Sequence, residues 1–464
     1  MKKTKIAYLP LYIKLYDDIN TATRKPLVEY MNTLVSMIES QGFEVVLPED
    51  VCRIKEEFDR AAEKFNSDPE IVAVVTEHLA YSPSLESIEA LLSLKAPIIV
   101  LDTTPSYELI SCAAYSDRIS PNHGIHGVQD MCNLLKRNGK PFQICVGHAM
   151  HSDVIARVCG LCRAAACAKA FRESRIGMVG GEFEGMGDFR ISDERYESEI
   201  GANTIRMSFE DGKKYTAAVT DDEIQNEIIS DAAKYSIFAE NEDNYRAATR
   251  AGLAVRKWMN DNGLNSVTVN FLHIEESGLE KMPFMECCKA LERGQGYAGE
   301  GDNLTAGLTG ALLASYPNTT FTEMFCPDWE KDIILLSHMG EFNPRLVAWK
   351  PHVNDKPFKY NVTGDTVAMS ACYRKGTAVL ANLAPMNDSF SLILSKVELT
   401  DDGLEYGAYR KAVQGWLKPA MPIADFLKAY SEAGGTHHSA MVYDADIQDL
   451  AAFGKMMGFN VVII

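Results

Sequence analysis

The sequence predicts an α/β protein in which two Rossmann-like domains with parallel sheets precede a mostly antiparallel, barrel-like β domain. Through the first two thirds of the chain, short apolar runs alternate with amphipathic stretches. This alternation is typical of a parallel sheet covered by helices on both faces. In the last third, strand-like runs follow one another with turn sequences between them, which favours an antiparallel sheet or small barrel. The predicted domains are residues 1–172, 173–318 and 319–464.

The first domain is predicted from five short apolar runs, each followed by a stretch with helical periodicity. Its strands are expected at residues 6–9, 43–47, 71–75, 97–101 and 142–146. Its helices are expected at residues 26–39, 54–65, 85–94, 126–137 and 153–172. The segment that follows the first strand is expected to be a loop.

The second domain continues the same alternation, and the third departs from it. Strands at residues 175–179 and 267–271 and helices at 245–260, 284–293 and 304–315 are expected in the second domain. The third is expected to contain strands at residues 333–336, 366–373, 376–383, 390–397 and 441–443, then a helix at 446–457 and a strand at 460–464.

The composition narrows the class of partner. Asp and Glu number 64 against 46 Lys and Arg, which gives a net charge of −18. That balance argues against a nucleic-acid partner and against docking on an anionic membrane. The sequence contains no signal peptide pattern and no apolar stretch long enough to span a bilayer. Eleven scattered cysteines fit buried thiols better than a disulfide framework, so a cytoplasmic protein is expected.

Four segments hold an unusual density of metal-ligand residues: 294–302, 321–329, 335–344 and 434–439. Between them they offer two carboxylates and two imidazoles, a suitable ligand set for Mn²⁺ or a similar divalent ion. Each segment alone has an ordinary structural interpretation: a loop glutamate after glycines, a packed histidine on a strand, or a surface histidine pair. Asp302 is also placed to cap the helix that follows it.

These segments together resemble the L-arabinose isomerase family, which is related to the L-fucose isomerases. The family pattern is matched, in order, by Gly294-Gln-Gly-Tyr-Ala-Gly-Glu-Gly-Asp302, by Glu323 about two dozen residues later, by Ser337-His-Met and by Gly434-Gly-Thr-His-His438. The similarity runs from about residue 4 to 464. It implies a three-domain fold of α/β, α/β and β type, which agrees with the pattern of elements.

The resemblance also implies an activity: a metal-dependent sugar isomerase that moves a proton between C1 and C2 of an open-chain sugar through a cis-enediol. By resemblance, Glu300 and Glu323 are metal ligands and the acid/base pair, and His338 and His438 are the other two ligands. Mn²⁺ is expected, with Co²⁺ or Mg²⁺ as alternatives. A sugar-binding or regulatory relative without turnover, and a ketose epimerase that uses the same metal site, are the competing functions.

Further residues are expected to contact the sugar, some across a subunit boundary, because the family assembles as homo-oligomers, typically hexamers. They are Lys14, Tyr16, His78, His123, His126, Met186, Phe271 and His437. Instead of contacting the sugar, His437 could lie behind the metal ligands and support them. Lys14 departs from the family pattern. It suits a sugar other than L-arabinose with an anionic end group, such as a 6-sulfo sugar, although a solvated lysine beside the site explains it equally.

Overall fold

The computed structural model describes residues 3–19, 21–110, 115–404 and 412–464 and divides into two compact units, residues 1–166 and 167–464. Each unit is described by itself. The α/β class predicted from the sequence is confirmed, with two parallel sheets followed by a closed antiparallel barrel.

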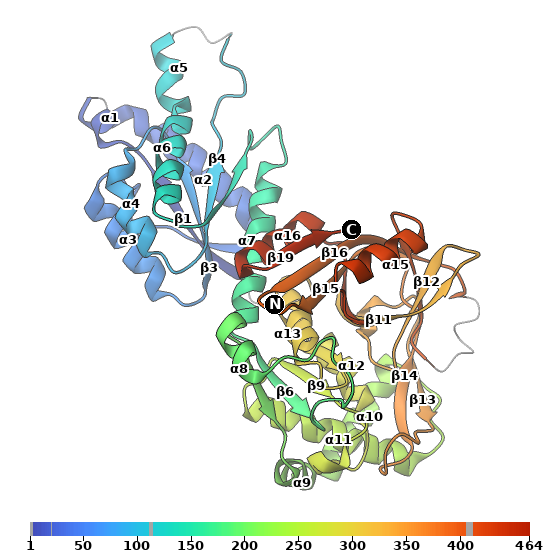
Figure 1. Ribbon diagram of the computed structural model, residues 1–464. Helices are drawn as coiled ribbons and strands as arrows, with labels where there is room; N and C mark the ends of the chain where they lie inside the picture. Colours follow the sequence, from blue (N-terminus) through green and yellow to red (C-terminus); the bar gives the residue numbers. More distant parts are fainter. Residues whose placement is uncertain (1–2, 20, 111–114, 405–411) are drawn as a thin grey trace. The chain divides into compact units, whose positions relative to one another are not determined.

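The first unit is built on a five-stranded parallel sheet of order β2-β1-β3-β4-β5. The strands are β1 (Thr4–Leu11), β2 (Phe43–Val46), β3 (Ile71–His78), β4 (Ile98–Asp102) and β5 (Phe142–Val146). The helices are α1 (Lys14–Ile19), α2 (Arg24–Ser40), α3 (Lys55–Ser67), α4 (Ser84–Ser93), α5 (Tyr115–Asn122), α6 (Gly124–Arg137) and α7 (Val154–Arg172), the last of which continues into the second unit. Helices α3, α4 and α6 pack side by side (Figure 1).

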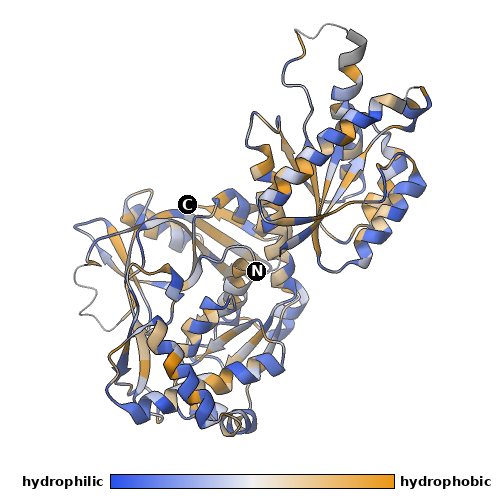
Figure 2. Ribbon diagram, turned by 180° about the vertical axis from the view of Figure 1, so that it is seen from behind, coloured by the Kyte–Doolittle hydropathy of each residue, from blue (hydrophilic) through white to orange (hydrophobic). Residues whose placement is uncertain are grey.

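The central strand β3 shows why this sheet forms. All eight of its residues are buried, which is the expected pattern for a parallel strand covered on both faces. Its apolar half lies in the core, whereas its carboxyl end carries the polar residues Thr76, Glu77 and His78. In Figure 2 the strands of this sheet are mostly orange and the outer helices carry much of the blue, as burial of the sheet requires.

The second unit begins with a four-stranded parallel sheet of order β10-β9-β6-β7. These strands are β6 (Arg175–Val179), β7 (Asn203–Arg206), β9 (Ser266–Val269) and β10 (Gly296–Gly299). The helices of this region are α8 (Asp193–Arg195), α9 (Phe209–Ala217), α10 (Asp221–Lys234), α11 (Glu242–Asp261), α12 (Phe284–Glu292) and α13 (Asn303–Leu313).

The rest of the second unit is a β-barrel and a small sheet. Six antiparallel strands of order β15-β18-β11-β12-β17-β16 close because β15 also pairs with β16, and β19 adds to β16 in parallel. The strands are β11 (Thr319–Asp328), β12 (Ile333–Ser337), β15 (Gly376–Pro385), β16 (Phe390–Thr400), β17 (Gly415–Pro419), β18 (His438–Tyr443) and β19 (Asn460–Ile463). Helices α15 (Ile423–Glu432) and α16 (Ile447–Met457) accompany it, and β8 (Ser236–Ile237), β13 (His352–Lys356) and β14 (Thr366–Ser370) form the small sheet.

Helix α13 joins the parallel sheet to the barrel. It is almost entirely buried and packs against strands β6, β9 and β10 on one side and β11, β15 and β18 on the other (Figure 1). Close approach depends on Gly296, where an added Cβ would lie 2.2 Å from the carbonyl oxygen of Ala306. This contact brings the carboxyl end of β10 next to the barrel.

One local expectation from the sequence is wrong: the segment after β1 is not a loop, because helix α1 begins at Lys14. The edge strand β10 at Gly296–Gly299, in the glycine-rich motif before Glu300, was not predicted. It pairs with β9, which lies about 30 residues earlier in the sequence. Among the described residues, none of the helices combines the length and the apolar character that a membrane crossing needs.

Candidate metal centre

Glu300 is the first candidate ligand, and its backbone is unusual. It follows β10 directly, with φ of 65° and its N–H donating to the carbonyl oxygen of Val269 at 2.8 Å. A non-glycine residue in this left-handed region is strained, and such strain concentrates at functional sites. Glycines on both sides make the turn possible: an added Cβ on Gly299 would lie 2.8 Å from the His338 ring, and Gly301 itself has φ of 79°.

Three further candidate ligands come from neighbouring strands of the barrel. Glu323 on β11 lies opposite His438 on β18 and opposite Ser337 on β12. Opposed residues in an antiparallel pair have side chains within contact distance. His338 follows Ser337, so three barrel strands bring a carboxylate and two imidazoles to the end of β10.

The four predicted metal ligands therefore converge in the second unit. Ligand atoms of Glu323, His338 and His438 lie within 4.8 Å of one another, as do those of Glu300, His437 and His438. Glu300 Oε2 is 3.4 Å from His438 Nε2 and 3.5 Å from His437 Nε2, whereas Glu323 Oε2 is 4.0 Å from His338 Nε2. His438 belongs to both groups and links them.

Two buried carboxylates orient the imidazoles. His338 Nδ1 lies 2.7 Å from Glu341 Oε2, and the Tyr297 hydroxyl donates to the other oxygen of Glu341 at 2.7 Å. His438 Nδ1 lies 3.0 Å from Asp302 Oδ2. An ionised carboxylate can only accept, so each Nδ1 carries the proton and each Nε2 presents its lone pair to the centre, as metal-binding histidines do.

The donor set fits a divalent cation. His438 Nε2 is buried and has no hydrogen bond within the described part of the chain, a costly arrangement unless a ligand completes it. Carboxylate and imidazole donors suit Mn²⁺, Co²⁺ and Mg²⁺ to different degrees, and soft thiolates do not approach them. Glu300, Glu323, His338 and His438 are the residues that would hold the ion.

The electrostatics also favour a positive charge here. Burial alone would lower the pKa of His438, but its interactions with the carboxylates of Asp302 and Glu300 outweigh burial and raise that pKa to about 9. Likewise, Asp188 and Glu300 raise the pKa of His437 to about 10 despite burial. A metal ion would take the place of the proton that these carboxylates attract to His438.

The two candidate acid/base carboxyls differ. Burial would raise the pKa of Glu300, but hydrogen bonds from His437 and His438 are stronger and lower it. For Glu323, burial dominates and raises the pKa, although His338, His438 and His437 oppose it. Opposite environments are what an acid and a base that work together require.

Aromatic rings close the site around the histidines. Phe189 stacks on His438 with a centroid separation of 5.2 Å, and the edge of Phe321 packs 4.9 Å from both His338 and His438. Such packing limits the rotation of the imidazoles and lowers the local dielectric constant, which strengthens the electrostatic interactions.

The predicted sugar contacts Met186 and Phe271 also lie in the second unit. Met186 lines a small cavity with Phe183 and Gly301, next to Glu300. Phe271 is 8% exposed and packs on Phe183 at 5.7 Å, and the N–H of Phe183 donates to the carbonyl oxygen of Glu300 at 3.2 Å. Both are therefore connected to Glu300 through its immediate neighbours.

The remaining predicted contacts belong to the first unit, where three of them meet. The Tyr16 hydroxyl lies 3.4 Å from His123 Nδ1, and His123 Nε2 lies 2.7 Å from His126 Nδ1. Lys14 is exposed and donates to both carboxylate oxygens of Asp18, at 2.7 and 3.0 Å. That ion pair agrees with the solvated-lysine interpretation.

His78 differs from Tyr16, His123 and His126 because it is a core residue. Its side chain lies at the carboxyl end of β3 and is 3% exposed, under Gly124 and Gly127 of α6. Burial lowers the pKa of His78 to about 3, so the imidazole is neutral.

Sequence reasoning missed the residues that support the ligands. Asp302 was assigned only as a helix cap, which it is, since it accepts from Thr305 N at 2.8 Å. Glu341 lies three residues after His338 inside a noted motif, so its position was available as a signal. Asp188, which contacts both the N–H and Nδ1 of His437, lies 249 residues away in sequence and gave no signal.

Comparisons with known proteins identify the family of the chain. Three family models match in chain order: the L-arabinose isomerase N-terminal domain at residues 22–173, its central domain at 194–315 and its C-terminal domain at 318–460. An L-arabinose isomerase of Clostridium beijerinckii is 27% identical over 408 residues, 86% of this chain and 82% of that protein. One of Aeromonas hydrophila is 24% identical over 492 aligned positions, 100% of this chain and 95% of that protein. The chain therefore belongs to the L-arabinose isomerase family, a family of sugar isomerases.

Proposed function

We propose that the chain is a divalent-metal-dependent aldose–ketose isomerase that acts on an open-chain sugar. The observation that carries the proposal is the convergence of Glu300, Glu323, His338 and His438, with the Nε2 atom of His438 buried and without a hydrogen bond in the described part of the chain. The names of the relatives support the reaction class, and Mn²⁺ is the expected ion.

Glu300, Glu323, His338 and His438 would hold the ion, which would supply Lewis-acid polarisation of the sugar carbonyl. The chain's own residues would do the rest. Asp302 and Glu341 hold the two imidazoles in one tautomer, and Phe189 and Phe321 keep water from the histidine faces. Met186 and Phe271 would bind the carbon chain of the sugar.

Proton transfer between C1 and C2 would fall to Glu300 and Glu323. One carboxylate takes the proton from carbon to give a cis-enediol, and the other carboxyl returns a proton to the neighbouring carbon. The lowered pKa of Glu300 keeps this carboxylate deprotonated and free to accept a proton, and the raised pKa of Glu323 favours its protonated form.

The first unit would supply the rest of the sugar site. We propose that Tyr16, His123 and His126 act together, because they already contact one another. A homo-oligomer such as a hexamer would let this cluster reach the metal centre of a neighbouring subunit. The cytoplasmic location and the three-domain division expected from the sequence belong to the same proposal.

The test is a substrate panel with protein stripped of metal and reloaded with Mn²⁺. L-Arabinose, L-fucose, D-arabinose, D-galactose, a uronate and a 6-sulfo sugar would be followed by NMR for aldose–ketose conversion. Conversion of at least one sugar that depends on added metal is the expected result. A change of configuration at one carbon, without aldose–ketose conversion, would indicate the epimerase instead. Sugar binding without any turnover would indicate a binding protein.

A further inference from the structure

Lys356, the last residue of β13, is a partly buried cation without a counterion in the described structure. Its Nζ lies over the ring of Phe284, 5.3 Å from the centroid. Within the described ranges its side chain forms no salt bridge and no hydrogen bond. Lys289 of α12, which is buried, is paired with both Glu227 and Asp231. Lys356 is therefore the exception that needs an explanation.

The segment that follows Lys356 packs on the predicted sugar site. Asn361 donates from Nδ2 to the carbonyl oxygen of Phe271 at 2.5 Å. The rings of Phe358 and Tyr360 lie 6.0 and 5.6 Å from the ring of Phe271. Phe271 packs on Phe183, and the N–H of Phe183 donates to the backbone of Glu300. A series of aromatic contacts therefore connects the candidate metal centre with the segment that follows Lys356.

The environment of Lys356 disfavours an unpaired charge. Burial lowers its pKa, and the charge of Glu341 raises that pKa only in part. Glu341 is already occupied by His338 and Tyr297, and its oxygens are beyond salt-bridge distance of the lysine. A partly desolvated ammonium group is unfavourable unless a partner pairs with its charge. An anionic group on a ligand would be such a partner.

We propose that Lys356 determines substrate class by binding an anionic group on the sugar, at the end remote from the carbonyl. The proposal rests on the proposed function, since the metal ligands fix which end of the sugar carries the carbonyl. Carboxylate, sulfate and phosphate groups share the chemistry that an ammonium recognises.

The experiment compares Lys356→Gln, Lys356→Arg and the matched control Lys359→Gln, which removes an exposed lysine from the same segment. Binding of D-galactose, D-galacturonate, D-galactose 6-sulfate and D-galactose 6-phosphate to the Mn²⁺-loaded proteins is measured by calorimetry. The wild type is expected to bind one anionic sugar at least tenfold more tightly than D-galactose. Lys356→Gln should lose that tenfold preference, and Lys356→Arg and Lys359→Gln should keep most of it.

Two results would overturn the proposal: equal wild-type affinity for neutral and anionic sugars, or equal weakening of Mn²⁺ and D-galactose binding in Lys356→Gln. The second would mean that Lys356 serves Glu341 and the metal site. Unchanged Mn²⁺ affinity also shows that the variant is folded. Binding that follows the expected pattern without turnover of any sugar would refute the isomerase function and leave the assignment of Lys356 intact.

Discussion

At the scale of single residues, the backbone of Glu300 shows how the site is built. Its left-handed conformation turns the carboxylate from the end of β10 toward His437 and His438. Replacement of residues in such a conformation is tolerated only when the surrounding structure holds the backbone in place. Here the bonds to Val269 and Phe183 do so. The carboxylate can therefore be changed without loss of the turn.

Glu300→Gln should abolish isomerisation and spare the fold. The amide cannot accept the proton and is a poor metal ligand, so turnover should fall by a factor on the order of a thousand or more. The measurement is conversion of the best sugar of the panel by NMR, with circular dichroism as the check on folding. Glu184→Gln, which changes an exposed glutamate of the same unit, is the control. Turnover above a trace would contradict the acid/base role.

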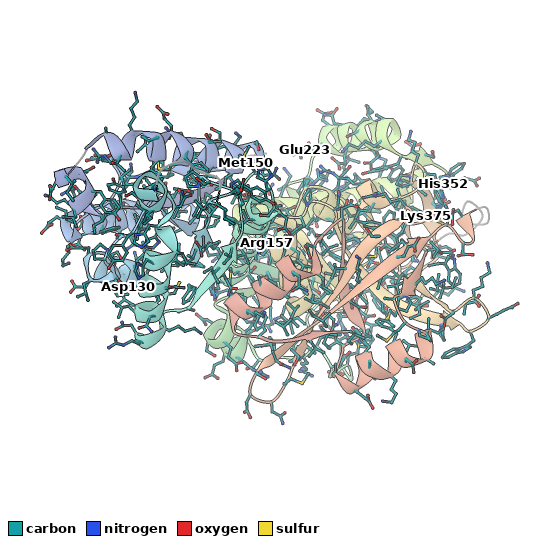
Figure 3. The ribbon with its side chains drawn as sticks, turned by 90° about the horizontal axis from the view of Figure 1, so that it is seen from above. Asp130, Met150, Arg157, Glu223, His352 and Lys375 are labelled. Atoms are coloured by element: carbon teal, nitrogen blue, oxygen red, sulfur yellow. The ribbon has the colours of Figure 1, made fainter. Side chains whose placement is uncertain are left out.

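His438→Ala should weaken metal binding more than any other histidine substitution, because His438 Nε2 faces both candidate ligand groups. The loss should exceed the roughly 10–100-fold that is typical when only a supporting residue is removed. His352→Ala is the control, since His352, labelled in Figure 3, belongs to the small sheet of β8, β13 and β14 and to neither candidate ligand group. Unchanged metal content of His438→Ala after dialysis would show that His438 is not a ligand and would make His437 the next candidate.

At the scale of elements, helix α13 has two functions at its first turn. Asp302 caps the helix by accepting from Thr305 N through Oδ1, and it orients His438 through Oδ2. One side chain therefore connects the start of a core helix to a barrel strand. This arrangement couples the stability of α13 to the geometry of the metal centre.

Substitutions at Asp302 should separate these two functions. Asp302→Asn keeps an oxygen for the cap but weakens the acceptor for His438, so metal affinity should fall roughly 10–100-fold with little loss of stability. Asp302→Ala should lose the same affinity and also about 1 kcal/mol of stability from the missing cap. Metal titration and urea denaturation measure the two effects. Equal metal affinity in wild type and Asp302→Asn would refute the orienting role.

At the scale of the whole molecule, the centre draws its ligands from two sheets of the second unit. Glu300 follows the parallel sheet, whereas Glu323, His338 and His438 belong to the barrel. A bound ion would therefore crosslink the two sheets. Ligands that bind only the folded state stabilise it by mass action.

Saturation with Mn²⁺ should raise the melting temperature of the second unit. At a free concentration a thousand times the Kd, the expected stabilisation is about 4 kcal/mol. Tryptophan fluorescence reports this transition, because all four tryptophans lie in the second unit, at positions 258, 329, 349 and 416. A chelator should reverse the shift, and His438→Ala should show little of it. The same shift in His438→Ala would place the stabilising ion elsewhere.

The sequence by itself determined the fold class and the ligand-bearing motifs. Periodicity separates buried parallel strands from amphipathic helices. It predicted all five strands of the first parallel sheet and strands β6 and β9 of the second, because those runs are continuous and apolar. Residue type pointed to four ligand-rich segments, and the resemblance to the L-arabinose isomerase family singled out one candidate ligand in each of them. The short elements α1 and β10 were missed because their local patterns are too brief to be distinguished from turns.

Only the tertiary structure decided how those residues act. Closure of the barrel sets Glu323 opposite His438, and the packing of α13 places Glu300 and Asp302 beside them. Asp188 and Lys356 acquire significance from contacts with residues far away in sequence, which no local pattern encodes. Residue type determines which chemistry is possible, whereas distance and burial determine which atoms meet and in which charge state.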